Sequence, residues 1–181
     1  MTTFTVETKA LRAIAEVAAD AKDLRKYLRC VYFERDRMVA SNGVTAAVVA
    51  IEQHDGPYVL IPAEICKHAA KSKDKTITID LDQQLIGNVK FIPLDQNYPD
   101  WRRVIPESCS GEVAQFDPEL IAAAAKFYKT LGAQWHYMTI HHNGAGAAVV
   151  STKRQGACFV MMPLRDNVKS ESTVTWARSE S

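Results

Sequence analysis

The sequence predicts an α+β fold made of three repeated β-α-β-β(-β) units, with antiparallel sheets on the outside and helices on one face. Two observations support this prediction. A short apolar stretch leads into an alanine-rich helix three times, and after each helix the apolar residues change from helical to alternating spacing. An apolar residue also stands five positions before the first buried helical residue in each repeat, in the pairs Val6 and Leu11, Leu60 and Ile65, and Phe116 and Ile121.

The first unit starts with residues 4–11, where a strand-like stretch leads into a helix over residues 12–19. Residues 27–34 and 37–52 then carry β-branched and aromatic residues in alternating or continuous runs, as strands do. Asn42-Gly43 lies inside the second run and favours a tight hairpin turn, because both residues tolerate positive φ. We therefore expect a helix followed by antiparallel strands.

The second unit repeats this order. Residues 58–65 lead past Pro62 into a helix at 66–71, because proline is well tolerated where a helix begins. The period of two then returns in residues 76–81 and 86–94, which we expect to form strands.

The third unit begins at residues 115–121, a strand-like stretch that leads into the alanine-rich helix. Asp117-Pro118 is a typical start signal for that helix. We expect the run Ala122–Ala125 to let the helix pack closely on a sheet. Three strands should follow, separated in part by a turn at residues 143–146, and they are expected over residues 138–142, 147–152 and 157–162.

A polar segment at residues 95–111 separates the third unit from the first two. We expect residues 1–97 to form a complete domain of two units, and residues 98–165 to form half of such a domain. Residues 166–181 form a polar tail with little to pack except Val174 and Trp176. The tail is expected to be a solvated end, or else to fold back into a neighbouring pocket.

The composition excludes several classes of protein. With 181 residues, 47% hydrophobic and 24% charged, the chain falls in the globular range. No apolar run approaches the roughly 20 residues of a membrane span, and the first residues lack the pattern of a secretory signal. We therefore expect a cytoplasmic protein. The net charge of +1 means that any attraction to nucleic acid must be local.

No group of residues predicts catalysis or a bound metal. The four cysteines are scattered, so we expect reduced thiols and no zinc site. His141 and His142 are adjacent on a predicted strand and would point to opposite faces, so with His136 they are expected to be surface histidines. The stretch at residues 108–111 reads as linker, because no strand-turn-helix elbow surrounds its serines and cysteine. We expect a protein that is not an enzyme and needs no cofactor.

Four segments carry a family resemblance. Residues 98–106, with the sequence Tyr-Pro-Asp-Trp-Arg-Arg-Val-Ile-Pro, and residues 159–165, Phe-Val-Met-Met-Pro-Leu-Arg, resemble two signatures of the bacterial DNA polymerase β sliding clamp. Residues 23–28 and 39–43 resemble landmarks of that family's middle domain. The resemblance extends over nearly the whole chain up to Arg165, and it implies the DNA-clamp (processivity) fold.

The resemblance also implies a function. Sliding clamps are non-enzymatic rings of six two-unit domains, in which twelve helices line a hole for duplex DNA and sheets form the outer surface. A clamp loader places them on DNA, and they tether DNA polymerases and other proteins that carry a clamp-binding peptide. We therefore expect a DNA sliding clamp. The alternative is a non-encircling module that binds, or competes for, clamp-binding peptides.

In the family, the peptide docks in an apolar pocket between the middle and last domains. Methionine, leucine, valine and proline can form an adaptable floor, and arginines at the rim can meet peptide carboxylates. The loop at residues 42–46 lacks the basic and larger apolar side chains that are usual there, which puts peptide specificity in question. The residues that match the pocket are Arg25, Leu28, Ser41, Gly43, Val44, Thr45, Pro99, Arg103, Val104, Met161, Met162, Pro163, Leu164 and Arg165.

Basic residues on the predicted helices are candidates for contact with DNA. A few cations that face phosphates give weak, salt-sensitive and sequence-independent contact, as sliding requires. Lysines near the end of a helix also complement its dipole on any protein surface, so both interpretations stay open. The candidates are Lys9, Arg12, Lys67, Lys71, Lys126 and Lys129.

The number of units suggests an assembly. If a ring still needs twelve units and each chain supplies three, four chains are required. We therefore expect a homotetramer, with unpaired sheet edges at the two ends of the protomer joining the chains head to tail.

Overall fold

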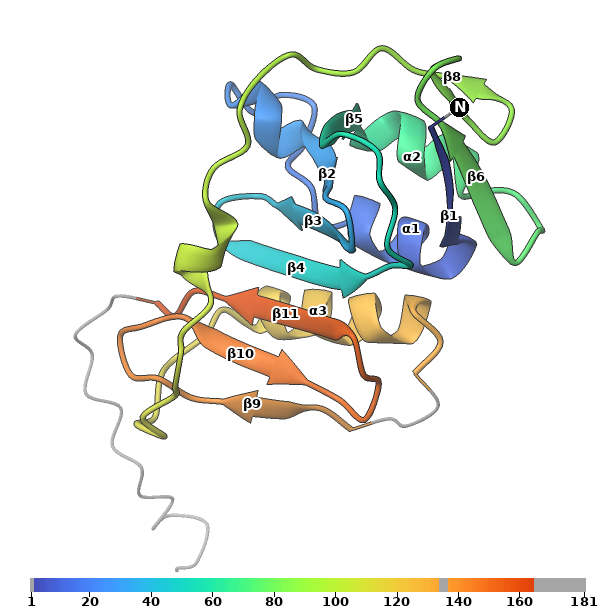
Figure 1. The fold of residues 1–181 in the computed structure, drawn as a ribbon. Helices are drawn as coiled ribbons and strands as arrows, with labels where there is room; N and C mark the ends of the chain where they lie inside the picture. The colour runs from blue at the N-terminus through green and yellow to red at the C-terminus, as the bar shows by residue number, and fades with distance from the viewer. Residues whose placement is uncertain (1, 134–136, 165–181) are drawn as a thin grey trace, which may run out of the picture.

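A computed structural model describes residues 2–133 and 137–164, and three units follow one another along the chain (Figure 1). The first contains β1 (Thr3–Glu7), α1 (Thr8–Ala15), the 3-10 helix η1 (Lys26–Arg29), β2 (Cys30–Phe33), β3 (Arg37–Ser41) and β4 (Thr45–Ala50). The second contains β5 (Val59–Pro62), α2 (Ala63–Ala69), β6 (Thr76–Asp80), β7 (Leu85–Ile86) and β8 (Val89–Lys90). After η2 (Trp101–Val104), the third contains α3 (Pro118–Thr130), β9 (Thr139–His141), β10 (Ala148–Ser151) and β11 (Ala157–Met161). The predicted α+β class and the order of three units are confirmed, although unit 3 has no strand before its helix among the described residues.

Units 1 and 2 exchange their first strands. β1 of unit 1 pairs with β6 of unit 2, and β5 of unit 2 pairs with β2 of unit 1. The exchange gives a four-stranded sheet with the order β1-β6-β7-β8 and places β5 beside β2. With the strands of unit 3, the second sheet has seven strands in the order β5-β2-β3-β4-β11-β10-β9. Because each unit supplies a strand to the other's sheet, neither unit is complete alone.

The third unit joins the first through their last strands. β11 pairs antiparallel with β4, with Ala157 opposite Val49 and Met161 opposite Thr45. The ladder continues past β11, where the Met162 amide donates to the Val44 carbonyl at 3.0 Å. This pairing makes one continuous sheet of strands from all three units.

The three helices lie on one side of the seven-stranded sheet, with α1 between α2 and α3 (Figure 1). α1 begins where the Thr8 hydroxyl donates to the Asp74 carbonyl at 2.6 Å. The start of α3 is capped by Asp117, whose carboxylate accepts from the Glu119 amide at 2.9 Å, and Pro118 occupies its first turn. The predicted start signal at Asp117-Pro118 is thus confirmed.

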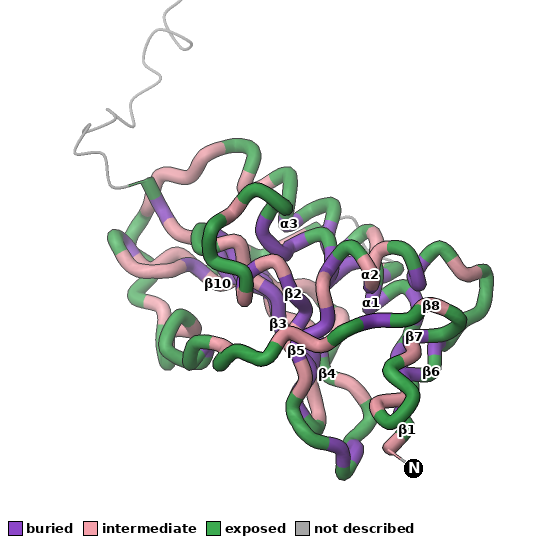
Figure 2. The backbone as a smooth tube through the Cα atoms, turned by 90° about the horizontal axis from the view of Figure 1, so that it is seen from above, coloured by how far each residue is buried: buried purple, intermediate pink, exposed green. Residues whose placement is uncertain are grey.

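The core fills the space between helices and strands. Leu11 and Ile14 of α1, Phe33 of β2 and Phe159 of β11 are fully buried, and the Phe159 ring lies 5.4 Å from the ring of Phe127 in α3. In Figure 2 the buried positions lie where helices and strands meet. Because α1 packs against a helix on each side, it buries every residue except Lys9 and Arg12.

Two expectations for the third unit are wrong. In the stretch at residues 115–121, which was expected to be strand-like, residues 115–117 form no strand and residues 118–121 already belong to α3. The segment at residues 112–117 instead passes the turn between β9 and β10, where the Gly144 amide donates to the Glu112 carbonyl at 2.9 Å. The run Ala122–Ala125 does not pack as a whole either, because only Ala124 is buried. The first difference has a physical cause: a first strand pairs with the sheet of another unit, and the described chain offers unit 3 no such unit.

The predicted linker is anchored on the first unit by a buried carboxylate. Glu34, at 7% exposure, follows β2, and its carboxylate accepts hydrogen bonds from Nη1 and Nη2 of Arg102 at 3.0 and 2.7 Å. The indole nitrogen of Trp101 donates to the same carboxylate at 3.1 Å, and the Arg102 guanidinium lies 4.3 Å from the Trp101 ring centre. A bidentate partner and an aromatic face offset the cost of burying this charge.

None of the helices in residues 2–133 and 137–164 has the length and apolar character needed to cross a bilayer.

Candidate nucleic-acid and peptide interfaces

The basic residues predicted to face DNA all lie on the helix layer or directly after it. Lys9 and Arg12 are exposed on α1, and Lys126 and Lys129 are exposed on α3. Lys67 is half-buried on α2, and Lys71 is exposed two residues after that helix ends. The layer thus carries cations from all three units, and their contact with DNA stays a prediction.

Two of these cations sit at the carboxyl ends of neighbouring helices. Arg12 donates from Nε to the Ala70 carbonyl, at the end of α2, at 3.0 Å, and its Nη2 donates to the same oxygen. The Lys9 ammonium lies beside Gly132, just past α3, where a Cβ built on the glycine would stand 3.4 Å from Nζ. Positive charge is favourable at these ends because helix carbonyls there lack partners.

One carboxylate interrupts the basic layer. Glu16, just after α1, accepts a hydrogen bond from the Lys126 ammonium of α3 at 2.9 Å. This hydrogen bond lowers the pKa of Glu16, and the nearby charges of Lys67 and Lys126 act in the same direction. Two of the six candidate cations, Arg12 and Lys126, therefore already have protein partners.

The predicted peptide pocket is partly assembled around the turn between β3 and β4. The Asn42 carboxamide oxygen accepts from the amides of Val44 and Thr45 at 2.9 and 2.8 Å, and the Ser41 hydroxyl donates to the Thr45 carbonyl. Gly43 has φ +90, so the predicted turn is confirmed and a side chain at this position would be strained.

Arg25 lies over this turn. Its guanidinium donates to the Asn42 carbonyl at 3.3 Å, and a Cβ on Gly43 would stand 2.7 Å from Nη1. It also donates to both oxygens of Asp23, at 3.0 and 2.7 Å, and these side-chain hydrogen bonds lower the pKa of Asp23 to about 2. The predicted rim arginine and turn are therefore in contact.

The end of β11 brings the predicted pocket floor to the same turn. Met161 pairs with Thr45, and Met162 bonds to Val44. Met161 and Pro163 are buried, as is Leu28 of η1, whereas Val44 and Leu164 are about half exposed, at 48% and 50%. An apolar surface is thus open beside a packed floor.

The other predicted pocket residues lie elsewhere. Pro99, Arg103 and Val104 are exposed on the linker, where Arg103 pairs with Asp100 at 3.3 Å. Arg165 lies outside the described residues, as does the tail with Val174 and Trp176. Of the predicted set, the structure brings together the turn, η1 and the end of β11, and the role of every residue of the set in peptide binding stays a prediction.

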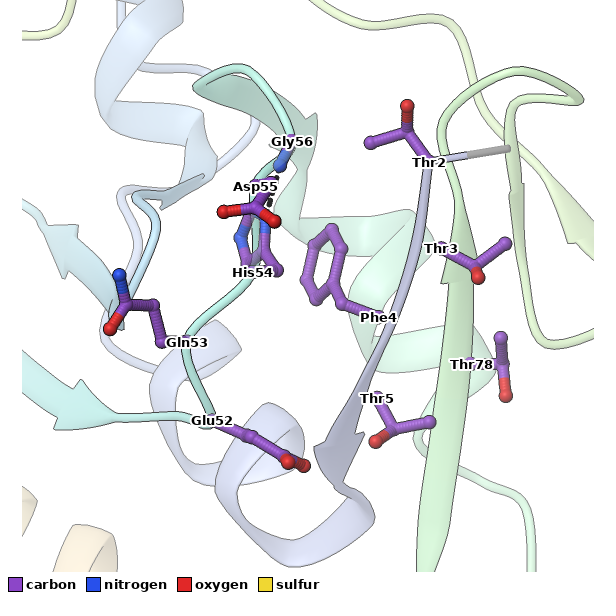
Figure 3. A pocket seen from close by; sticks show the side chains of 10 residues that line it. All are labelled: Thr2, Thr3, Phe4, Thr5, Glu52, Gln53, His54, Asp55, Gly56 and Thr78. Carbon is purple, nitrogen blue, oxygen red and sulfur yellow. Dashed lines mark hydrogen bonds between the residues drawn. The ribbon is translucent and has the colours of Figure 1, made fainter.

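A polar cavity of about 490 Å³ was not anticipated from the sequence (Figure 3). It lies between β1 and the segment at residues 52–56, and His54 forms part of its wall. The His54 ring is stacked on Phe4 at 3.8 Å, its Nε2 bonds to the Glu34 carbonyl at 2.9 Å, and its Nδ1 accepts from the Gly56 amide at 3.1 Å. The stack on Phe4 holds this segment against β1, and the two ring nitrogens tie His54 to Glu34 and Gly56.

The histidines weighed as metal ligands have other contacts. His141 Nε2 lies 2.8 Å from the Ser151 hydroxyl, and His142 Nδ1 accepts from the Ala114 amide at 3.3 Å. His136 lies outside the described residues. Within the part of the chain that the structure describes, no group of histidine, cysteine, aspartate and glutamate could hold a metal ion.

The strand exchange, the joined sheet and the helix layer together make up the DNA-clamp fold of sliding clamps. The DNA polymerase III beta subunit of Thermotoga maritima superposes with a TM-score of 0.66 at 17% identity, covering 92% of this chain and 66% of that one. The beta subunit of Pseudomonas aeruginosa gives 0.67 at 16% identity, covering 92% and 67%. The sliding clamp of Bartonella birtlesii, bound to griselimycin, gives 0.65 at 15% identity, covering 91% and 66%.

The chain spans about two thirds of the length of these solved proteins. No protein-family model and no curated protein sequence matches it. The comparisons therefore establish the fold, and the fold expected from the four sequence segments is confirmed.

We predict that stability falls in mild acid through His54. Burial lowers the pKa of His54 from its ordinary value of 6.5, an effect that the Glu34 carbonyl and Asp55 partly offset. As pH falls below that value, the unfolded state binds a proton that the folded state resists, so stability drops by at most about 1.4 kcal/mol per pH unit. Urea unfolding of the wild type and of His54→Gln at pH 7 and pH 5.5 would measure this. An equal loss in both proteins would contradict it.

Proposed function

We propose that this chain is a DNA sliding clamp, a non-enzymatic processivity factor that encircles duplex DNA as a homo-oligomeric ring. The observation that carries the proposal is the row of α2, α1 and α3 on one side of a continuous sheet, with basic residues on every helix. In this proposal residues 1–97 are a complete clamp domain and residues 98–165 are half of one.

The electrostatics of the helix layer suit sliding. Lys9, Lys71 and Lys129 are exposed, and they are spread over three units instead of being gathered in one patch. Long, flexible ammonium side chains contact phosphates without reading bases, so the chain can move along any sequence. With a net charge of only +1, binding that lasts must come from encirclement and not from bulk attraction.

The surface formed by the turn at residues 41–45 and the end of β11 is proposed to receive clamp-binding peptides. The half-exposed Val44 and Leu164 offer apolar contact, and Arg25 stands at the edge of the turn. The partners would be a DNA polymerase or repair protein that carries such a peptide, together with a clamp loader. Bartonella birtlesii clamp, of the same fold, is bound to griselimycin in its solved structure.

A second candidate is a module that binds clamp-binding peptides without encircling DNA. It is favoured by the pairing of Arg12 with the end of α2 and of Lys126 with Glu16, since both cations already have protein partners. This candidate shares the peptide surface and differs only in its behaviour on DNA.

We predict that the protein, once placed on circular duplex DNA by a clamp loader, stays bound in high salt and dissociates when the circle is cut. Encirclement is topological, whereas phosphate contacts alone weaken steeply with salt. Gel filtration of labelled protein with nicked circular and linearised DNA would measure this. Retention that is equally salt-sensitive on both forms would support the non-encircling module.

We predict that Leu164→Asp lowers affinity for a synthetic clamp-binding peptide by at least tenfold, because a carboxylate would replace half-exposed apolar surface. Fluorescence anisotropy would measure binding. Ile92→Asp is the matched control, since Ile92 is 81% exposed and lies on the second unit. Equal affinity of Leu164→Asp and the wild type would show that the peptide binds elsewhere.

A further inference from the structure

Two kinds of joint connect the units of this chain. In the first, units 1 and 2 exchange their first strands, so that β1 lies beside β6 and β5 lies beside β2. In the second, units 1 and 3 pair their last strands, β4 and β11, antiparallel. The first joint is reciprocal, since each unit gives its first strand to the strand that follows the helix of the other, and the second joint pairs like strands. Both are relations that a local two-fold axis produces.

Unit 3 has formed only one of these joints within the described residues. Its last strand, β11, is paired with β4. The strand after its helix, β9, is the end of the seven-stranded sheet, whereas the equivalent strands β2 and β6 each pair with the first strand of another unit. Its own first segment, residues 112–117, forms no strand. An open strand edge carries unpaired backbone donors and acceptors and favours pairing with another chain.

Residues that are buried at the joint of units 1 and 2 have less buried counterparts in unit 3. Val6 in β1 and Ile77 in β6 face each other across the first joint and are 3% and 4% exposed. The counterpart of Val6 in unit 3 is Phe116, because each stands two residues before the start of its helix. The counterpart of Ile77 is Ile140, because the tripeptide Thr-Ile-His of β9 matches Thr-Ile-Thr of β6. Both are only partly buried, so this side of unit 3 resembles a joint without its second half.

We propose that unit 3 exchanges its first segment with unit 3 of a second copy of this chain, so that residues 113–117 of each copy pair antiparallel with β9 of the other. The proposal rests on the three-unit architecture of the proposed clamp and specifies how two chains meet. In the single chain, residues 112–115 are bonded to their own unit, for example through the Leu164 amide, which donates to the Gln115 carbonyl at 2.8 Å. Exchange of an identical element is a low-cost route from such a state to a dimer.

The first joint supplies the register. With Val6 opposite Ile77, Thr5 stands opposite Thr78, and the same register sets Phe116 of one copy opposite Ile140 of the other, and Gln115 opposite His141. At the two ends of this ladder, the Leu81 amide donates to the Thr2 carbonyl and the Thr8 amide donates to the Lys75 carbonyl. The hydrogen-bonded pairs therefore contain the even-numbered residues of β1. Thr5 and Thr78 are therefore a non-hydrogen-bonded pair, with Cα atoms about 4.5 Å apart.

Helix packing agrees with this joint. α1 and α2 pack against each other where units 1 and 2 exchange strands, and Arg12 of α1 reaches the end of α2. The same joint between two copies brings their α3 helices together. Ala122, Ala123 and Ala125 are exposed on α3, and their small side chains would let a second helix approach closely.

The joint also changes the symmetry expected for a ring. Among the described residues the two sheets end in β1, β5, β8 and β9. Because β1 and β5 already form the joint between units 1 and 2, two elements have not joined another unit: the exchange side of unit 3, at β9, and the last strand of unit 2, β8. A head-to-tail ring would have to join these unlike elements. If instead unit 3 joins unit 3 and β8 joins β8, four chains still form a ring of twelve units. The two kinds of joint between chains then alternate around the ring, and each has its own two-fold axis.

Mixed disulfide cross-linking tests the proposal. Co-expressed Gln115→Cys and His141→Cys chains, each with one new cysteine, should form a disulfide-linked dimer on a non-reducing gel after mild oxidation. Neither variant alone, nor the wild type with its four native cysteines, should do so. The matched control is Gln115→Cys with Val149→Cys, because Val149 pairs with His141 and lies one strand farther from the open edge.

Light scattering on the wild-type chain at 100 μM separates the possible outcomes and does not depend on the variants folding. A dimer or tetramer with the specific cross-link supports the exchange. An oligomer whose mixed variants fold but cross-link no more than the control overturns the exchange and leaves the proposed clamp intact. A monomer overturns the exchange and the homo-oligomeric ring together.

Discussion

Units 1 and 2 of this fold depend on each other, because the strand that begins each of them pairs in the sheet of the other. β1 has its place only in the sheet of unit 2, and β5 only in the sheet of unit 1. Phe4 and Val6 are buried because of this exchange, and they support α1, which is the centre of the helix layer. The pairing of β4 with β11 then adds the third unit and sets α3 beside α1. The arrangement of the basic residues follows from these two joints.

Cations of the helix layer have contacts within the protein, and in the proposed clamp they would also face DNA. Arg12 occupies the carboxyl end of α2, Lys9 lies beside the end of α3, and Lys126 pairs with Glu16, so these charges help to hold neighbouring helices together. Lysine ammonium groups at exposed positions can exchange such partners for phosphate at small cost, since exposed ion pairs contribute little. A surface that is stable without DNA and attracts it weakly is compatible with sliding.

The sequence predicted the elements better than their partners. The repeat, the start of α3 at Asp117 and the turn at Gly43 are local, because capping and positive φ depend on a few neighbouring residues. Residues 114–117 alternate between apolar and polar as residues 4–7 of β1 do, yet they form no strand, because a strand also needs an edge to pair with. The buried Glu34 could not be recognised either, since its partners Trp101 and Arg102 lie far along the chain. Of the candidate pocket, the local turn was predictable, whereas the contact of Val44 with Met162 depends on the joint of β4 and β11.

The central claim is that unit 3 is completed by a second copy, and hydrogen exchange of the β9 amides (Thr139–His141) tests it most directly. An open edge leaves alternate amides of this strand to solvent, whereas an exchanged strand covers them. The amides of β9 should therefore become slower to exchange as protein concentration rises, and should approach the protection of β10 in the assembled state. Fast exchange at β9 that does not change with concentration would contradict the claim.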